Sequence, residues 1–210
     1  MRLEEKEFDE QKCSVDDGLI EICLPSGLKL PCVKELIRKS SKIFDRMLDP
    51  IYTDSSKSSV AISDVNEDVF VAMVHFMHDC EIHINYFTTE CVNCKYEHYE
   101  VPPQGERTQW RFIMDLLIIA ERFCVHDLSK LCENFLSGTL SDENAGEVFM
   151  LSCWYNCEKL INDSLRYVLT NTRCPKYRTK YFAEILLSHE KDTFLKKIED
   201  YLSGMLLTRK

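Results

Sequence analysis

Cysteine and histidine side chains in the middle of the chain are spaced as in zinc-binding proteins. Cys80 and His83 form a C-x2-H pair, and Cys91 and Cys94 form a C-x2-C pair. Thiolate and imidazole ligands at this spacing can hold one face of a tetrahedral zinc ion. Only seven residues separate the two pairs, fewer than most zinc fingers use, and chance pairs are common among 11 cysteines. We therefore expect a loop with reduced thiols and no cofactor, with a structural zinc as the alternative.

The chain contains none of the short motifs that mark common catalytic centres. It has no G-x-S-x-G, no glycine-rich phosphate loop and no H-E-x-x-H, and its six glycines are scattered. The 11 cysteines and six histidines leave a Cys/His nucleophile pair open, but no spacing singles one out. Cys153 and Cys157 lie one helical turn apart, and we expect them to pack in a core. The sequence thus predicts a protein that is not an enzyme.

The charge of the chain argues against nucleic acid and anionic membranes as partners. There are 26 Lys and Arg against 35 Asp and Glu, a net charge of -9, so no basic excess is present to neutralise phosphates. The longest apolar run, residues 116–120, is shorter than the about 20 residues of a membrane-spanning helix. The charged N-terminus lacks the apolar stretch of a signal peptide. We expect a cytoplasmic or nuclear location, with reduced cysteines.

Apolar alternation predicts a small amount of β-structure after a charged arm over residues 1–16. Residues 19–24 and 28–30 flank the turn sequence Pro25-Ser26-Gly27, and this arrangement predicts a β-hairpin. Apolar residues at helical spacing then predict two short helices, which include residues 33–37 and 43–48. Residues 60–62 are expected to form a strand. Residues 64–67 resemble a capping box that opens a further helix.

The second half of the chain is predicted to be almost entirely helical. Residues 83–108 break the pattern and are expected to form an irregular excursion, whereas residues 109–123 predict a helix buried at the centre of a domain. Further helices are expected at about 144–156 and 159–170, followed by two amphipathic helices past Pro175. The helix in between is expected to start at Asp127, break at Ser137-Gly138 and bury Leu128, Leu131, Cys132 and Phe135.

This order of elements, with the residues in it, resembles the BTB/POZ family. Residues 30–33 and 41–47 are similar to the family stretch F-P-A-H…L-A-A-R-S-P-x-F-x-x-M, and residues 60–65 are similar to its next strand. Residues 116–131, with Cys132 after them, resemble the signature L-L-x-x-A-x-x-x-x-x-x-x-L-x-x-x-C. Residues 143–144 stand where a BACK-type helical extension opens in many members. Several matches in the right order favour membership more than any one motif does.

The resemblance implies an α+β fold in three parts. Residues 1–16 would be the arm, residues 17–140 a BTB/POZ domain with an insertion at 83–108, and residues 141–210 an all-α BACK-like or three-box extension. Many BTB domains form homodimers. Here Val33 replaces the histidine that starts the first helix in the family, and Leu19 occupies the place of an early aspartate. Because those positions support the dimer in the family, a homodimer remains open for this chain.

The resemblance also implies a role in protein–protein interaction. Many members bind cullin-3 and act as substrate adaptors of a RING ubiquitin ligase in the ubiquitin conjugation pathway. Their mark is a hydrophobic-x-Glu triplet after the second helix, which corresponds here to Tyr52, Thr53 and Asp54. A tyrosine can fill a partner's pocket, and a carboxylate can accept hydrogen bonds. Asp54 is one methylene shorter than glutamate. The interpretation is an adaptor for an unidentified protein substrate; the alternative is a scaffold or oligomerisation module without cullin binding.

A second cullin contact in such relatives comes from the first helices of the extension. The corresponding residues are about 144–170, where Val148, Leu151, Trp154 and Tyr155 follow one side of a predicted helix. Apolar residues at helical spacing usually pack inward. We therefore expect these four side chains to belong to the core of the extension, and a groove for a cullin segment is the alternative.

Overall fold

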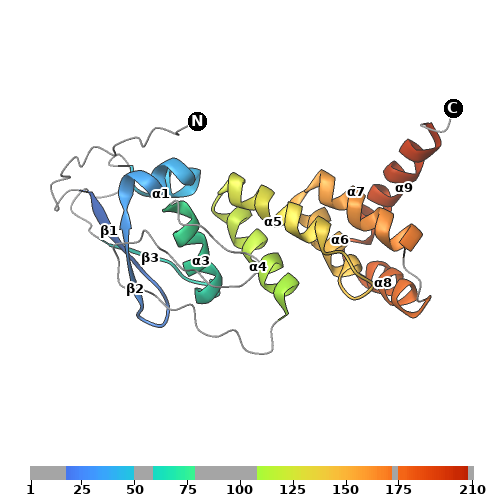
Figure 1. Ribbon diagram of the computed structural model, residues 1–210, viewed down its shortest axis with the longest axis horizontal. Helices are drawn as coiled ribbons and strands as arrows, with labels where there is room; N and C mark the ends of the chain where they lie inside the picture. Colours follow the sequence, from blue (N-terminus) through green and yellow to red (C-terminus); the bar gives the residue numbers. More distant parts are fainter. Residues whose placement is uncertain (1–17, 50–58, 79–107, 172–174, 208–210) are drawn as a thin grey trace, which may run out of the picture.

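The computed structural model describes residues 18–49, 59–78, 108–171 and 175–207, and it is elongated, with a sheet at one end and helices at the other (Figure 1). Strand β1 spans Leu19–Cys23, β2 spans Lys29–Val33 and β3 spans Ser59–Ala61. β2 pairs antiparallel to β1, and β3 pairs parallel to its other side, so the order is β2-β1-β3. The predicted hairpin and the predicted strand are both present.

The hairpin turn is built by the residues that predicted it. The Gly27 N–H donates to the Leu24 carbonyl at 2.9 Å, and the Leu24 N–H donates to the Leu28 carbonyl at 2.8 Å. Gly27 has a φ of 91°, which a residue without a Cβ adopts at no steric cost. Pro31 lies in β2, which is an edge strand, where a missing N–H is tolerated.

The BTB-like helices and the extension succeed one another in chain order. The helices before residue 140 are α1 (Lys34–Ser40), α2 (Lys42–Met47), α3 (Glu67–Met77), α4 (Gln109–Arg122) and α5 (His126–Gly138). Those after it are α6 (Ala145–Tyr155), α7 (Glu158–Arg166), the π-helical turn η1 (Tyr167–Asn171), α8 (Pro175–Leu187) and α9 (Lys191–Leu207). The predicted α+β fold class is confirmed.

Three phenylalanine rings pack together and hold α2 against the rest of the N-terminal core. The Phe44 ring in α2 stacks on Phe123, which lies just after α4, with centroids 5.2 Å apart. Phe70 in α3 meets both rings edge-on, at 6.5 Å from Phe44 and 5.4 Å from Phe123. The buried Ser41 hydroxyl donates to the Phe123 carbonyl at 2.5 Å and accepts from the Phe44 N–H at 3.1 Å. Ser41 thus caps α2 and ties it to the α4–α5 turn.

Helix α6 belongs to two hydrophobic cores. Val148 and Leu151 join the larger core, which contains the sheet and helices α1 to α5. Phe149 and Cys153 on the same helix join a smaller core with residues of α7, α8 and α9. A helix that is apolar on nearly all sides is expected to be buried. α6 therefore connects the BTB-like part and the extension through packing rather than through a flexible linker.

Polar side chains reinforce the contact between α5 and α7. The Ser137 hydroxyl donates to Asp163 Oδ2 at 2.5 Å, and Lys159 Nζ donates to Asn134 Oδ1 at 2.6 Å. Between the two helices, α6 is followed by its C-terminal cap Asn156, which adopts a left-handed φ of 54°. Asparagine tolerates this conformation better than most residues do. The extension therefore turns back onto α5 at a defined place.

Two local expectations are wrong. The predicted capping box at residues 64–67 does not form, because Asp64 has a φ of 56° and α3 starts only at Glu67. The Glu67 carboxylate accepts from the Ser26 N–H of the hairpin turn at 2.6 Å instead. Leu131 is 37% exposed on α5, and Leu136 is buried in its place. The predicted break at Ser137-Gly138 is present, because α5 ends at Gly138.

Replacing Ser41 by alanine is expected to lower the free energy of unfolding by about 1–3 kcal/mol, because the variant loses the cap of α2 and leaves the buried Phe123 carbonyl without its hydroxyl donor. Chemical denaturation of the two proteins measures this difference. The control is Ser63→Ala, at an exposed position, which should change stability by no more than about 0.5 kcal/mol. Equal effects of both variants would show that Ser41 does not anchor α2.

Replacing Gly146 by alanine is expected to destabilise the extension by about 2 kcal/mol or more. A Cβ at this position would overlap the ring of the buried Tyr181, whose hydroxyl donates to the carbonyls of Asp142 at 2.9 Å and Glu143 at 2.6 Å. Hydrogen exchange at the amides of α8 should increase. Gly138→Ala is the matched control, since a Cβ there meets nothing within 4 Å. Unchanged exchange in α8 would contradict the proposed packing.

Candidate partner-binding surface

The predicted cullin-contact residues Tyr52, Thr53 and Asp54 lie outside the described residues, but both of their flanks are placed. On one side α2 ends in a turn where the Leu48 N–H donates to the Phe44 carbonyl at 2.9 Å. On the other side Ser59 starts β3 and pairs with Glu21 of β1. The two ends of the segment are therefore tied to the aromatic cluster and to the sheet.

A groove of about 470 Å³ lies beside the place where Ser41 and Phe44 attach α2 to the core. It is bounded by α1, α2 and the α4–α5 turn. Leu36, Phe76 and Val125 supply its apolar surface, and the buried Val125 continues into the core. The polar residues along its edge are Lys39, Ser40, Lys42, His126 and Asp127.

The edge of this groove is more basic than the chain as a whole. Lys39 and Lys42 carry two positive charges against the single negative charge of Asp127, in a chain with a net charge of -9. Apolar side chains of a partner can pack inside the groove, while the lysines attract acidic groups. The arrangement therefore suits a protein segment that combines apolar and acidic side chains.

The turn between α4 and α5 gives this surface its shape. Cys124 has a left-handed φ of 54°, and the next residue, Val125, donates its N–H to the Ala120 carbonyl at 2.8 Å. Arg122, at the end of α4, donates to the carbonyl oxygens of Ser63 and Asp64 at 3.4 and 2.8 Å. These bonds hold the turn against the segment just after β3.

The four predicted core residues of α6 have two different environments. Val148 and Leu151 are buried, as expected. Tyr155 is only partly buried, and the Trp154 side chain is 55% exposed, with its ring centroid 6.3 Å from that of Phe194 in α9. The expectation that all four side chains lie in the core is therefore wrong for Trp154. This exposed indole is available to a partner.

The buried cysteines of the described residues are structural. Burial raises the pKa of the Cys32, Cys153 and Cys157 thiols to about 12, and it also raises the pKa of the Cys132 thiol. These thiols stay protonated at neutral pH and are poor nucleophiles. Cys153 and Cys157 lie in the two cores, as the sequence predicts.

The candidate zinc residues Cys80, His83, Cys91 and Cys94 lie outside the described residues. Among the residues that the structure describes, no three His, Cys, Asp or Glu side chains gather closely enough to hold a metal ion. Within the same residues, none of the helices has the length and apolar character needed to cross a membrane.

The groove beside α2 was not predicted from the sequence. Its lysines lie in the polar stretch around residues 38–42, whereas Cys124, His126 and Asp127 lie more than 80 residues away along the chain. A run of basic residues between two short helices was the only local signal. The opposite wall of the groove, formed by residues 124–127, is held in place by the packing of Phe44 against Phe123. No local sequence pattern predicts that contact.

Comparison with known proteins agrees with this architecture. The sequence matches the BTB/POZ domain over residues 19–140. A BTB/POZ domain-containing protein of Arabidopsis thaliana is 22% identical over 85% of this chain and 63% of its own length. Protein maternal effect lethal 26 of Caenorhabditis elegans is 24% identical over 67% of this chain and 30% of its own length. TD and POZ domain-containing protein 4 of Mus musculus is 22% identical over 70% and 34%, respectively.

The chain thus spans less than two thirds of the length of these three relatives. The family match includes the three-stranded sheet and the helices α1 to α5 and ends just before the extension. Its domains are non-catalytic modules that dimerise and bind protein partners. On this match and on the fold that accompanies it, the chain belongs to the BTB/POZ domain family.

Proposed function

We propose that this chain is a substrate adaptor of a cullin-3 RING ubiquitin ligase, with the cullin bound by Tyr52, Thr53 and Asp54 and by the first helices of a BACK-like extension. In this proposal residues 17–140 form the BTB domain and residues 141–210 form the extension. The protein substrate would bind at a surface separate from the cullin contact. The proposal rests on the family of the chain and on the way in which α2 is anchored.

The anchoring of α2 is the observation that carries the proposal. A six-residue helix is too short to be stable by itself, yet α2 is held by the Ser41 hydrogen bonds and by the stack of Phe44 on Phe123. Residues 50–58 therefore follow a helix that is fixed to the core. A binding loop on a rigid base loses less conformational freedom when a partner is bound.

The surroundings of the anchor also support a protein partner. The basic-edged groove with Lys39 and Lys42 lies on the same helix pair, and the exposed Trp154 lies on the first helix of the extension. Exposed aromatic side chains such as Trp154 are enriched at the centres of protein interfaces, and lysines at the edge attract and orient acidic partners. Because α6 packs in both cores, it holds the BTB domain and the extension together. A cullin could therefore contact both parts at the same time.

Replacing Tyr52 by alanine is expected to weaken binding of the cullin-3 N-terminal domain at least tenfold, because the ring would fill a pocket of the cullin. Calorimetric titration should give a micromolar or tighter Kd for the unmodified chain. A micromolar Kd corresponds to a binding free energy of about -8 kcal/mol. Asp54→Glu should tighten binding, since it restores the reach of the usual glutamate. Leu187→Ala, at an 85% exposed position in α8, is the control and should not change the Kd.

The absence of measurable binding, or an unchanged Kd for Tyr52→Ala, would contradict the adaptor proposal. The chain would then be a BTB scaffold or oligomerisation module. Light scattering after size-exclusion chromatography would determine its mass in solution and therefore whether it self-associates.

Replacing Trp154 by alanine tests the contact of the extension separately. If the first helices of the extension bind the cullin, the loss of this exposed indole should weaken the same titration about threefold or more, because a large aromatic contact area is removed. The Trp154 ring is more than half exposed, so the fold should persist, and circular dichroism would verify that. An unchanged Kd would restrict the cullin contact to the BTB domain.

A further inference from the structure

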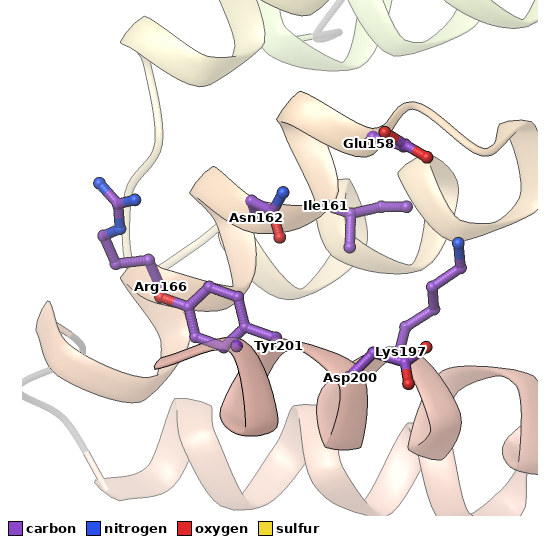
Figure 2. A pocket seen from close by; sticks show the side chains of 8 residues that line it. Glu158, Ile161, Asn162, Arg166, Lys197, Asp200 and Tyr201 are labelled. Carbon is purple, nitrogen blue, oxygen red and sulfur yellow. The ribbon is translucent and has the colours of Figure 1, made fainter. Parts of the chain in front are cut away.

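A second groove lies between α7 and α9, in the part of the extension most distant from the sheet (Figures 1 and 2). Its volume is about 560 Å³. The side of α7 contributes Glu158, Ile161, Asn162 and Arg166, and the side of α9 contributes Lys197, Asp200, Tyr201 and Gly204. The groove shares none of its residues with the surface around α2.

One stripe of polar residues runs along the edge of the groove on α7. Glu158, Asn162 and Arg166 are four residues apart, so they lie on one face of the helix, and all three are exposed. Ile161, next to this stripe, is only 4% exposed and belongs to the smaller core. The ring of Tyr201 packs against the same core from α9. The groove therefore has an apolar base between polar edges.

The hydrogen-bonding capacity of the groove is only partly used within the chain. The Arg166 guanidinium is hydrogen-bonded to the Tyr201 hydroxyl, which raises the pKa of the arginine. Lys197 Nζ donates to Asn156 Oδ1 at 2.8 Å. The side chains of Glu158, Asn162 and Asp200 make no hydrogen bond or ion pair with any other residue that the structure describes. These three side chains are free to bind a ligand.

Charge is distributed unequally along the groove. Glu158, Lys197 and Asp200 lie at one end, and Arg166 lies at the other end beside Tyr201 (Figure 2). Two negative charges and one positive charge leave the first end with a net charge of -1, whereas the second end has a net charge of +1. A bound segment would therefore be favoured when it presents a basic group to the first end and an acidic group to the second.

The length of the groove sets the length of that segment. Glu158 and Arg166 are eight residues apart on a helix, which is about 12 Å at 1.5 Å per residue. An extended chain covers about 3.3–3.6 Å per residue, so about four residues span the distance. The Asn162 side chain lies midway along the stripe and offers both a donor and an acceptor to an extended backbone.

We propose that the groove between α7 and α9 binds an extended segment of a partner protein. The segment carries a basic side chain at Glu158 and Asp200, an apolar side chain over Ile161 and Tyr201, and an acidic side chain at Arg166. This inference goes beyond the cullin proposal and does not depend on it, because none of the residues that test the cullin contact, Tyr52, Asp54 and Trp154, lines this groove. The groove would give the chain a second, peptide-reading surface.

The test uses the full chain and a phage library of random 12-residue peptides. Recovered peptides are expected to share a basic and an acidic residue about four positions apart, with an apolar residue between them. A library that yields no binder, or binders without this pattern, would overturn the proposal. The affinity of one recovered peptide is then measured by fluorescence polarisation.

A plug variant tests whether the peptide lies in the groove. A Cβ on Gly204 meets nothing within 4 Å, so Gly204→Leu should fold normally and fill the space between the helices. It is expected to weaken peptide binding at least tenfold. The matched control is Gly138→Leu at the end of α5, where a Cβ also meets nothing within 4 Å, and it should bind as the unmodified chain does. Equal affinity of the plug variant would overturn the proposal.

A charge exchange tests the direction of recognition. Arg166→Glu makes both ends of the groove acidic, so the variant is expected to prefer a peptide in which lysine replaces the acidic residue. The unmodified chain should prefer the original peptide by about fivefold, and the variant should reverse that order. A merely structural role of Arg166 would weaken both peptides equally and would contradict the proposal. The cullin-3 titration varies Tyr52, Asp54 and Trp154, none of which lines this groove, so the two proposals succeed or fail separately.

Discussion

The contact between α2 and the α4–α5 turn is the interaction on which the surface around α2 depends. α2 has only six residues and could not persist alone. One buried hydroxyl, on Ser41, both caps the helix and binds the Phe123 carbonyl, and one ring, on Phe44, stacks on the Phe123 ring. Residues 41–44 and residue 123 are far apart in the chain, so the surface exists only when the whole N-terminal core is assembled.

The two grooves of the chain differ in the kind of recognition that they allow. The groove beside α2 combines apolar side chains with an edge that is locally basic, which favours acidic partners. The groove between α7 and α9 has equal numbers of positive and negative groups, arranged with opposite net charge at its two ends. Its charges therefore contribute more to the orientation of a bound segment than to long-range attraction. A protein with a net charge of -9 thus carries two grooves with different distributions of charge.

Much of the architecture could be predicted from the sequence because its signals are local. Pro25-Ser26-Gly27 specifies the turn, and apolar spacing specifies the helices. The failures have tertiary causes: Glu67, predicted to close a capping box, is used by the Ser26 N–H instead. Trp154 has the spacing of a core residue but lies at the edge of the smaller core, where Phe194 covers only part of its ring.

The candidate sites could be predicted less well than the fold. Tyr52, Thr53 and Asp54 were identified through the resemblance to a family, and their place in the chain says little about their geometry. Both grooves, in contrast, are formed by side chains from separate helices. The stripe of Glu158, Asn162 and Arg166 can be recognised from its spacing, but an exposed polar stripe is the normal outer face of a helix. Only the position of α9 makes it one wall of a groove.

Because α6 is buried in both cores, the hydrophobic core of this protein extends beyond the segment that matches the BTB/POZ family. The family match ends at residue 140, yet the larger core extends to Val148, Leu151, Cys157 and Leu160. A fragment that stopped at residue 140 would uncover the apolar surface that these side chains occupy, and it would also lose the partners of Ser137 and Asn134. In this chain, any segment that replaced residues 141–210 would therefore have to cover the same apolar surface.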